Sequence, residues 1–335
     1  MSHSRDARDI RLPLTELRLR QRRSLDPARL YYSPRWLAAG GIGGLAWAAA
    51  ALRFGPRFVA ASAALGGALL GYMRLVEPRR PQLTRLSIEL PRLRPALSGL
   101  RIGHISDAHL GFPFTADTLA WAVAEMRRER PDIIALTGDF VSYRSAIPQI
   151  AALLRGIAAP LGVYAVAGNH DHWEGIGDVR AALELCGVRV LLNEHVLIEH
   201  RGARLAVAGV DDVWDGQPSL ERTLCGVPPD VPTVLLCHAP DVADDPAERG
   251  VDLQLSGHAH GGHFRLPLLG PFAMPRYGRR YVMGLHQIGA MRLFVSRGIG
   301  GAPLRLGCPP EAALLTLMSS RIPREPDAQG RRYPV

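Results

Sequence analysis

The chain has 335 residues, with 40 Lys or Arg against 31 Asp or Glu, and every one of the 40 is arginine. The absence of lysine excludes mechanisms that need a lysine amine, such as a Schiff base with a carbonyl substrate or a P-loop lysine on a nucleotide. An apolar fraction of 47% with 21% charged residues is ordinary for a folded protein.

The net charge of +9 lies wholly in the first 80 residues, which hold 14 arginines and five acidic residues. The rest of the chain holds 26 of each and is neutral. A basic nucleic-acid-binding module is the alternative that so high a charge suggests. Phosphate-backbone binding needs a basic surface on the working domain, however, so we expect no nucleic-acid partner.

The N-terminal part predicts a membrane attachment. Residues 1–35 are polar and arginine-rich, as in a basic cytosolic tail. Two uncharged apolar stretches follow, residues 36–52 and 58–73, each near the short end of the roughly 17–25 residues that cross a bilayer. We predict a transmembrane helical hairpin. Small residues one turn apart would let its helices pack closely in lipid: Gly40 with Gly44, and Gly67 with Gly71.

The arginines that flank this hairpin predict its orientation. Nine precede residue 36 and three lie between residues 74 and 80, whereas the turn has two. By the positive-inside rule both ends then face the cytoplasm. An export signal built on Arg22-Arg23 is the alternative, which we rank lower because a cleaved signal does not need a second apolar stretch.

Beyond the hairpin, residues 74–98 are rich in proline and arginine and predict a linker. A globular domain over residues 99–319 and a disordered tail over residues 320–335 complete the predicted organisation. Within the domain, short apolar runs alternate with helical patterns, which is typical of an α/β layered fold. The predicted strands are Leu100–Ser106, Asp132–Thr137, Leu161–Ala167, Arg204–Val210, Pro232–Cys237 and Val251–Ser256. The predicted helices lie around Thr118–Arg128, Ala146–Ile157 and Val179–Cys186.

Five of the six predicted strands end in side chains that could bind a metal ion. The motifs are Asp107-Ala108-His109, Gly138-Asp139, Gly168-Asn169-His170-Asp171, His238, and Gly257-His258-Ala259-His260-Gly261-Gly262. One Asp or His at a strand end is more often a cap or turn residue. Seven ligand-type residues in this order instead indicate a shared site at the carboxyl edge of the strands, where ligands bind in open α/β sheets.

The five motifs, in this order, resemble those of the calcineurin-like metallophosphoesterase superfamily over about residues 100–318. The resemblance implies a four-layer α/β/β/α sandwich, here preceded by the predicted transmembrane hairpin. The Gly-His-Ala-His-Gly-Gly form and the stretch Ser296–Pro310 look like the membrane-associated branch. That branch includes bacterial phosphodiesterases and enzymes that hydrolyse UDP-2,3-diacylglucosamine during lipid A synthesis.

The resemblance also implies a dinuclear metal site. One ion would be held by Asp107, His109 and His260, and the other by Asn169, His238 and His258. Asp139 would bridge both ions, His170 would act as general acid or electrostatic clamp, and Asp171 would orient its ring. Oxygen and imidazole ligands suit Mn²⁺, Fe, Zn²⁺ or Mg²⁺, and two such ions about 3.5–4 Å apart can activate a water that attacks phosphorus.

Other residues near these motifs have more open assignments. His263 stands where Gln is common in the branch, and Arg297 lies in a loop that the branch places near the pocket. Both are predicted as substrate contacts, Arg297 through a second phosphate. The alternatives are that His263 modulates His260 or only packs, and that Arg297 has a surface role. Asp211 and Asp212 share that neighbourhood without an assigned role.

The sequence therefore predicts a membrane-anchored metallophosphoesterase that cleaves a phosphodiester or pyrophosphate bond. A membrane-associated substrate such as UDP-2,3-diacylglucosamine, at the cytoplasmic face of a bacterial inner membrane, is the specific expectation. A general phosphodiesterase or phosphomonoesterase acting on soluble or cell-envelope substrates is the alternative. The four scattered cysteines indicate neither a disulfide framework nor a thiolate metal site.

Overall fold

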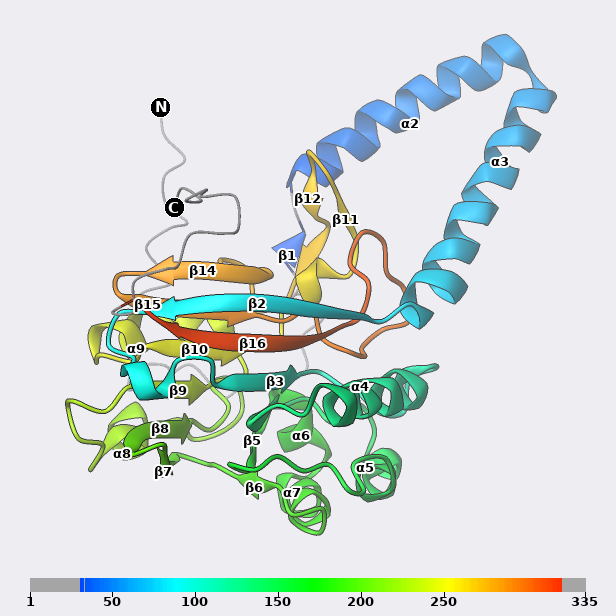
Figure 1. Ribbon diagram of the computed structural model, residues 1–335. Helices are drawn as coiled ribbons and strands as arrows, with labels where there is room; N and C mark the ends of the chain where they lie inside the picture. The colour runs from blue at the N-terminus through cyan, green and yellow to red at the C-terminus, as the bar shows by residue number, and fades with distance from the viewer. Residues whose placement is uncertain (1–30, 33, 321–335) are drawn as a thin grey trace, which may run out of the picture.

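Two six-stranded β-sheets lie face to face at the centre of the molecule (Figure 1). The computed structural model describes residues 31–32 and 34–320, so the predicted tails lie almost entirely outside the described residues. The first sheet has the order β2 (Gln82–Leu90), β16 (Glu311–Ser319), β3 (Arg101–Ile105), β4 (Ile133–Thr137), β5 (Val163–Val166) and β6 (Arg189–Val190). The second has the order β14 (Gly284–Ile288), β15 (Met291–Val295), β10 (Leu253–Ser256), β9 (Thr233–Leu236), β8 (Ala203–Gly209) and β7 (Glu194–His200).

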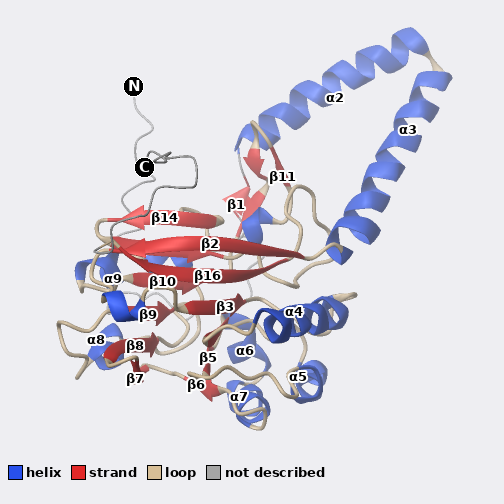
Figure 2. Cartoon of the chain, viewed as in Figure 1, coloured by secondary structure: helices blue, strands red, loops and turns tan. Residues whose placement is uncertain are grey.

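Helices cover the outer face of each sheet, which gives the four layers (Figure 2). On the first sheet they are α4 (Thr115–Glu129), α5 (Ile147–Leu153), α6 (Asn169–Glu174) and α7 (Ile176–Glu184). On the second sheet they are α8 (Leu220–Leu224) and α9 (Asp244–Glu248). The expected α/β/β/α sandwich and all six predicted strands are confirmed.

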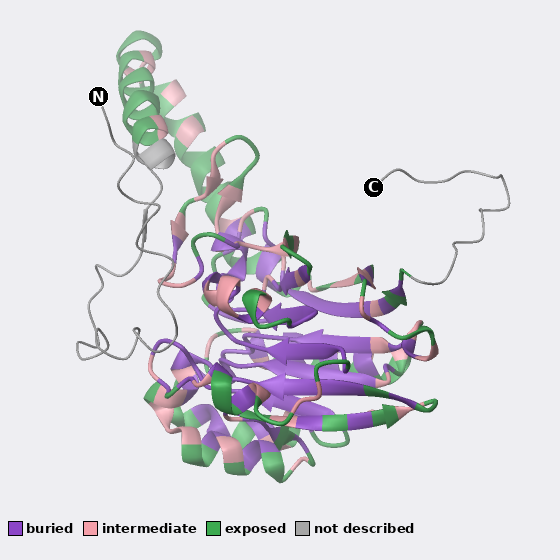
Figure 3. Ribbon diagram, turned by 90° about the vertical axis from the view of Figure 1, so that its left-hand side faces the viewer, coloured by how far each residue is buried: buried purple, intermediate pink, exposed green. Residues whose placement is uncertain are grey.

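Three apolar cores separate these layers, and the view coloured by burial shows the central strands of both sheets buried and the edge strands partly exposed (Figure 3). Alternate residues of one strand enter different cores, so Ile134 packs toward the helices and Ile133 packs between the sheets. Every residue of β4 is buried for this reason, which explains the unbroken apolar run in its sequence. The parallel strands β3, β4 and β5 all end at the same edge of the first sheet.

The predicted linker over residues 74–98 is wrong in its central part. Strand β2 occupies it and pairs in parallel with β16 from Gln82 opposite Glu311 to Leu90 opposite Ser319. Pro81 and Pro91 lie just outside the strand, where they remove no ladder hydrogen bond. The strand lies at the sheet edge and buries only Ile88 and Leu90, so its sequence has little of the apolar character of a central strand.

The N-terminal apolar stretches form two helices, α2 (Pro34–Phe54) and α3 (Pro56–Gly71), which meet at Gly55 with φ at 68°. Near this turn the Trp47 indole donates a 3.0 Å hydrogen bond to Ser62 Oγ. Farther from it the helices diverge (Figure 1). A Cβ added at Gly40, Gly44, Gly67 or Gly71 would meet nothing within 4 Å, so the predicted close packing of these glycines is wrong.

Only one helix among the described residues is long and apolar enough to cross a membrane. It comprises α3 and its continuation through a π-helical turn (Tyr72–Val76) and a 3₁₀ turn (Glu77–Arg79), so that it runs from Pro56 to Arg79. The apolar part of α2, Ala38–Phe54, is shorter. Length and composition thus indicate one crossing helix, and a double crossing stays a prediction.

Candidate metal centre

The predicted ligands come together where strands of both sheets end. Asp107 and His109 follow β3, Asp139 follows β4, and Asn169 follows β5. From the second sheet, His238 follows β9, while His258 and His260 follow β10. The centre therefore lies at the strand ends where the two sheets meet, and both sheets supply ligands.

Most of these residues have an unusual backbone conformation. Five of the seven have positive φ angles: Asp107 at 56°, His109 at 47°, Asp139 at 53°, His258 at 67° and His260 at 51°. This left-handed region costs a non-glycine residue about 1–3 kcal/mol and persists only where the surroundings hold it. Here the loops hold each other, since the amide of Asp107 donates to the Gly138 carbonyl at 3.0 Å and that of His109 to the Asp139 carbonyl at 2.9 Å.

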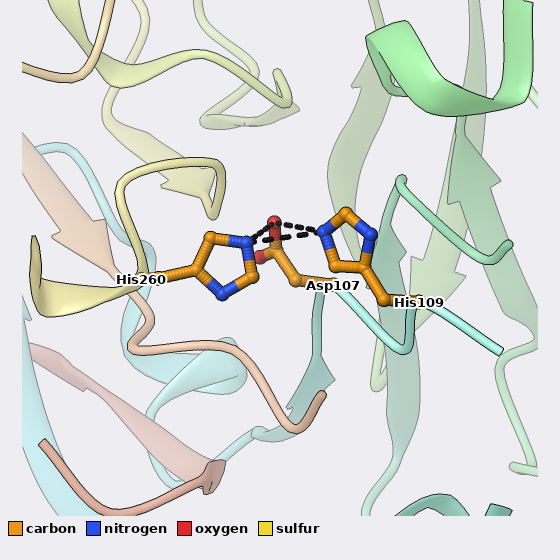
Figure 4. Close-up of side chains that lie close together, drawn as sticks. All are labelled: Asp107, His109 and His260. Atoms are coloured by element: carbon orange, nitrogen blue, oxygen red, sulfur yellow. Dashed lines mark hydrogen bonds and ion pairs between the residues drawn. The ribbon is translucent and has the colours of Figure 1, made fainter. Parts of the chain in front are cut away.

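One cluster consists of Asp107, His109 and His260, whose side chains face a common point (Figure 4). The Nε2 atoms of the two histidines are 3.1 Å apart. Asp107 Oδ1 lies 3.3 Å from His260 Nε2 and 4.0 Å from His109 Nε2. Two imidazole nitrogens and a carboxylate oxygen that converge in this way form a ligand set for a divalent ion.

A second cluster consists of Asp139, His238 and His258. His238 Nε2 is 3.2 Å from Asp139 Oδ2 and 3.2 Å from His258 Nδ1. The same Asp139 oxygen lies 3.4 Å from His109 Nε2 of the first cluster. One carboxylate oxygen is thus within reach of both clusters, as a bridging ligand requires.

Asn169 supplies an independent sign of metal binding. Its side chain is 2% exposed, and its Oδ1 has no hydrogen-bond partner among the described residues. Leaving such an oxygen buried and unpaired is costly, and a metal ion would satisfy it. The residues present therefore fit the two ions that the motifs predict.

Burial keeps three of the four histidines in the two clusters neutral. Burial lowers the pKa of His109 and of His258 to about 3, and it also takes the pKa of His260 well below its usual range. These rings are consequently neutral, which is the form that binds metals. Burial also raises the pKa of Asp107 to about 6, because the carboxylate is removed from water.

His238 and Asp139 form the charged pair of the centre. Burial opposes the charge on His238, but the Asp139 carboxylate beside it raises the histidine's pKa well above its usual range. Burial likewise disfavours the Asp139 carboxylate, yet His238 and His170 hold its pKa well below normal. A metal ion bound by these ligands would itself provide positive charge beside Asp139.

Three groups that sequence reasoning did not identify fix the histidine rings. His109 Nδ1 bonds Ser142 Oγ at 2.8 Å, His238 Nδ1 bonds the Thr137 carbonyl at 2.7 Å, and His258 Nε2 bonds the Arg276 carbonyl at 2.6 Å. Each bond leaves the opposite ring nitrogen facing the centre. Backbone carbonyls carry no sequence signal, whereas Ser142, three residues after Asp139, could have been noticed.

Ser142→Ala should weaken metal binding while the fold stays intact. Without the Ser142 hydroxyl, His109 Nδ1 loses its hydrogen-bond partner, and the loss of such a partner behind a metal ligand typically costs about 10–100-fold in metal affinity or activity. Activity measured against Mn²⁺ concentration should show a shift to higher concentrations. An unchanged metal dependence would mean that the bond does not orient the ring.

Glycine is required where loops press against the ligand carboxylates. A Cβ on Gly257 would lie 2.1 Å from Asp107 Oδ2 and 1.9 Å from Ser106 Oγ. A Cβ on Gly168 would lie 2.2 Å from Asp139 Oδ1. These contacts explain the glycines of both motifs by close approach of the backbone.

Gly257→Ala should therefore displace the Asp107 carboxylate and lower metal affinity by more than Ser142→Ala does. Gly177→Ala is the matched control, because nothing lies within 4 Å of the added methyl group in α7. Calorimetric titration with Mn²⁺ would compare the two variants. Equal affinities would show that the loop can move without disturbing Asp107.

His170 lies at the open side of the centre. Its ring is partly exposed and contacts His109 edge to face, with centroids 4.6 Å apart, and Trp173, with centroids 4.5 Å apart. Its backbone amide donates to Asp139 Oδ1 at 2.9 Å. The ring thus lies beside His109 and Asp139.

The predicted role of Asp171 in orienting the His170 ring is wrong. Asp171 is fully buried, and its two oxygens accept backbone hydrogen bonds from the amides of Asp139, Phe140 and Gly168 at 2.8–2.9 Å. The carboxylate therefore joins the loops after β4 and β5. It shapes the centre through the backbone and does not contact the His170 ring.

Arg297 is not placed as the predicted phosphate ligand. Its Nη2 forms a 3.0 Å ion pair with Glu311, and its backbone amide donates to the same carboxylate. The guanidinium is thus paired with the Glu311 carboxylate of β16. His263, the other predicted substrate contact, stacks on His260 with centroids 4.3 Å apart.

Asp211 and Asp212 already have protein partners, in their own loop and in α6. Asp211 bonds His172 Nε2 at 2.8 Å, and Asp212 Oδ2 accepts the amides of Trp214 and Asp215. The Trp214 ring meets the His258 ring edge to face at 5.6 Å. The loop thus supplies an aromatic wall to the second cluster.

Together the fold, the strand-end clusters and the sequence define the class of protein. The chain belongs to the calcineurin-like phosphoesterase family, whose sequence pattern matches residues 100–262. The family is dependent on two metal ions, and the chain is accordingly a metallophosphoesterase, a hydrolase of phosphoesters.

Its relatives include both bacterial and animal proteins. The metallophosphoesterase YkuE of Bacillus subtilis is 34% identical over 273 residues, which cover 78% of this chain and 94% of YkuE. Phosphodiesterase YaeI of Escherichia coli is 30% identical over 74% of this chain and 92% of its own length. A transmembrane protein with metallophosphoesterase domain from Bos taurus is 30% identical over 75% of this chain and 60% of that protein.

Proposed function

We propose that this chain hydrolyses a phosphodiester or pyrophosphate bond with two divalent ions held by the seven ligand residues. The observation that carries the proposal is the single Asp139 oxygen within 3.4 Å of a histidine from each cluster. Asp107, His109 and His260 would hold one ion, and Asn169, His238 and His258 the other. When bound, such a pair of ions supplies an activated water and neutralises the phosphoryl oxygens.

His170 is the residue best placed to act on the substrate itself. Its ring lies at the open side of both clusters, and Trp173 packs against it. In this position His170 would donate a proton to the leaving oxygen, or stabilise its charge. Trp173 and Trp214 would limit the access of water on that side.

The activity is tested with the full chain and Mn²⁺ on bis-p-nitrophenyl phosphate. We expect release of p-nitrophenol that is abolished by a chelator and restored by Mn²⁺. A protein that is folded and loaded with metal but inactive on a panel of diesters, monoesters and pyrophosphates would contradict the proposal.

For the natural substrate we propose a molecule at a membrane surface, with UDP-2,3-diacylglucosamine as the named candidate. The apolar helix Pro56–Arg79 and the relative named as a transmembrane protein support membrane attachment. The flanking arginines favour the cytoplasmic face of a bacterial inner membrane. UMP release from the lipid nucleotide would support this candidate. Turnover of soluble diesters alone would favour the general phosphodiesterase that the name of YaeI suggests.

A further inference from the structure

The two ends of the helix pair attach to the catalytic domain beside the metal centre. Ahead of α2, β1 (Tyr31–Tyr32) pairs antiparallel with β13 (Ala273–Met274). Beyond α3, the Met73 carbonyl accepts a hydrogen bond from the Arg305 amide at 3.1 Å, and Arg74 Nη1 donates to the Pro303 carbonyl at 3.0 Å. The segments at both ends of the α2–α3 helix pair, called its stems below, are therefore held by loops of the domain.

A short β-hairpin formed by β11 (Arg265–Leu266) and β12 (Gly270–Pro271) precedes β13 in the chain. In the view of Figures 1 and 2 it extends from the domain on the side that carries the helices. Its turn is Leu266-Pro267-Leu268-Leu269-Gly270, with no charged side chain.

The tip of this hairpin is apolar and exposed. Leu268 is 97% exposed, the highest value among the large hydrophobic residues that the structure describes, and Leu266 beside it is also exposed. Phe272, at the base of the hairpin, is partly exposed and packs edge to face on Phe264. Leu304, in the loop that holds the α3 stem, adds a further exposed apolar side chain. A lone exposed leucine is ordinary, but here several lie beside two apolar helices.

The tip is also connected directly to the metal centre. Phe264 forms a β-bridge with Leu306, and the Leu306 amide donates to the His263 carbonyl at 2.9 Å. His263 in turn stacks on the cluster residue His260. A contact made by the tip is therefore separated by only a few residues from the predicted metal ligand His260.

We propose that the β11–β12 tip, formed by Leu266 and Leu268, inserts into the surface of the phospholipid bilayer that receives the helices. The inference rests on the proposed membrane attachment and deepens it. With both stems and the tip at the lipid boundary, the loops that carry His260 and His263 lie close to the membrane, which favours phosphoesters carried by lipids as substrates. Insertion removes the exposed leucine side chains from water, which favours the docked orientation.

The test uses the full chain in vesicles of phosphatidylcholine and phosphatidylglycerol. An environment-sensitive NBD fluorophore is attached at Leu268→Cys, in a background where Cys225→Ser and Cys186→Ser remove the exposed and the half-buried native thiols. The matched control carries the fluorophore at Leu185→Cys, because Leu185 is 82% exposed and lies after α7, on the far side of the domain from the helices.

We expect the probe at position 268 to be quenched by spin-labelled lipids at a depth of about 5–10 Å below the headgroups, whereas the probe at 185 is quenched by aqueous iodide. Equal iodide quenching at both positions, on protein that floats with the vesicles, would overturn the docking proposal alone. Failure to float would overturn it together with membrane attachment. Turnover of bis-p-nitrophenyl phosphate by the same samples reports separately on the proposed catalytic function.

Discussion

Asp139→Asn should reduce phosphodiester hydrolysis by at least about a thousandfold, because the change removes the charge that both metal clusters share. The amide still fits, and its oxygen can still accept the His170 backbone hydrogen bond. A neutral amide cannot balance the charge on His238 or serve as an anionic bridge between two cations. The rate on bis-p-nitrophenyl phosphate at saturating Mn²⁺ measures the loss, and circular dichroism checks the fold.

Asp252→Asn is the matched control for this experiment. Asp252 is also buried, but it lies at the opposite end of β10 from His258 and accepts the Thr233 amide at 2.8 Å. We expect a loss of about 1 kcal/mol in stability and no change in rate at saturating metal. Comparable losses of rate in both variants, or an active Asp139→Asn enzyme, would contradict the role of Asp139.

Asp171→Ala should produce the largest loss of stability among the single changes considered. It leaves the three buried amides that Asp171 now satisfies without an acceptor. Each unsatisfied buried donor costs about 1–3 kcal/mol, so we expect at least about 3 kcal/mol in total. For a domain of this size that corresponds to a decrease of roughly 6–12 °C in the thermal midpoint of the metal-free protein.

Asp252→Ala is the comparison here, because it removes the acceptor of one backbone amide and should cost about a third as much. If Asp171→Ala instead left the thermal midpoint unchanged and lowered only kcat, Asp171 would act on the His170 ring as the sequence suggested. The two outcomes therefore separate a residue that holds loops from one that orients a catalytic ring.

The sequence predicts side chains that the structure brings together, because the chemistry of metal binding restricts which residues can serve. Metal binding requires particular side chains, and the carboxyl ends of parallel strands bring Asp107 and Asp139 to one edge. The strands themselves were evident because burial on both faces forces an uninterrupted apolar run such as Ile133–Leu136. The ligand-type residues and the apolar runs can both be recognised within short segments of the sequence.

The errors arose where the deciding contact is distant in the sequence. Strand β2 is fixed by pairing with β16, which lies more than 200 residues later, and its exposed Arg85 resembles a linker residue. The role of Asp171 depends on where the amides of the β4 loop lie in space. Arg297 resembles a phosphate ligand in its local sequence, but in the fold its guanidinium pairs with Glu311 of β16.

The central claim, a dinuclear metal centre at the strand ends, is tested most directly by metal content. The full chain is stripped with a chelator, equilibrated with Mn²⁺, separated from free metal, and analysed by mass spectrometry of the metal. We predict two ions per chain, with hydrolysis of bis-p-nitrophenyl phosphate rising to its maximum only as the second ion binds. One ion per chain at full activity, or full activity in the stripped protein, would contradict the claim.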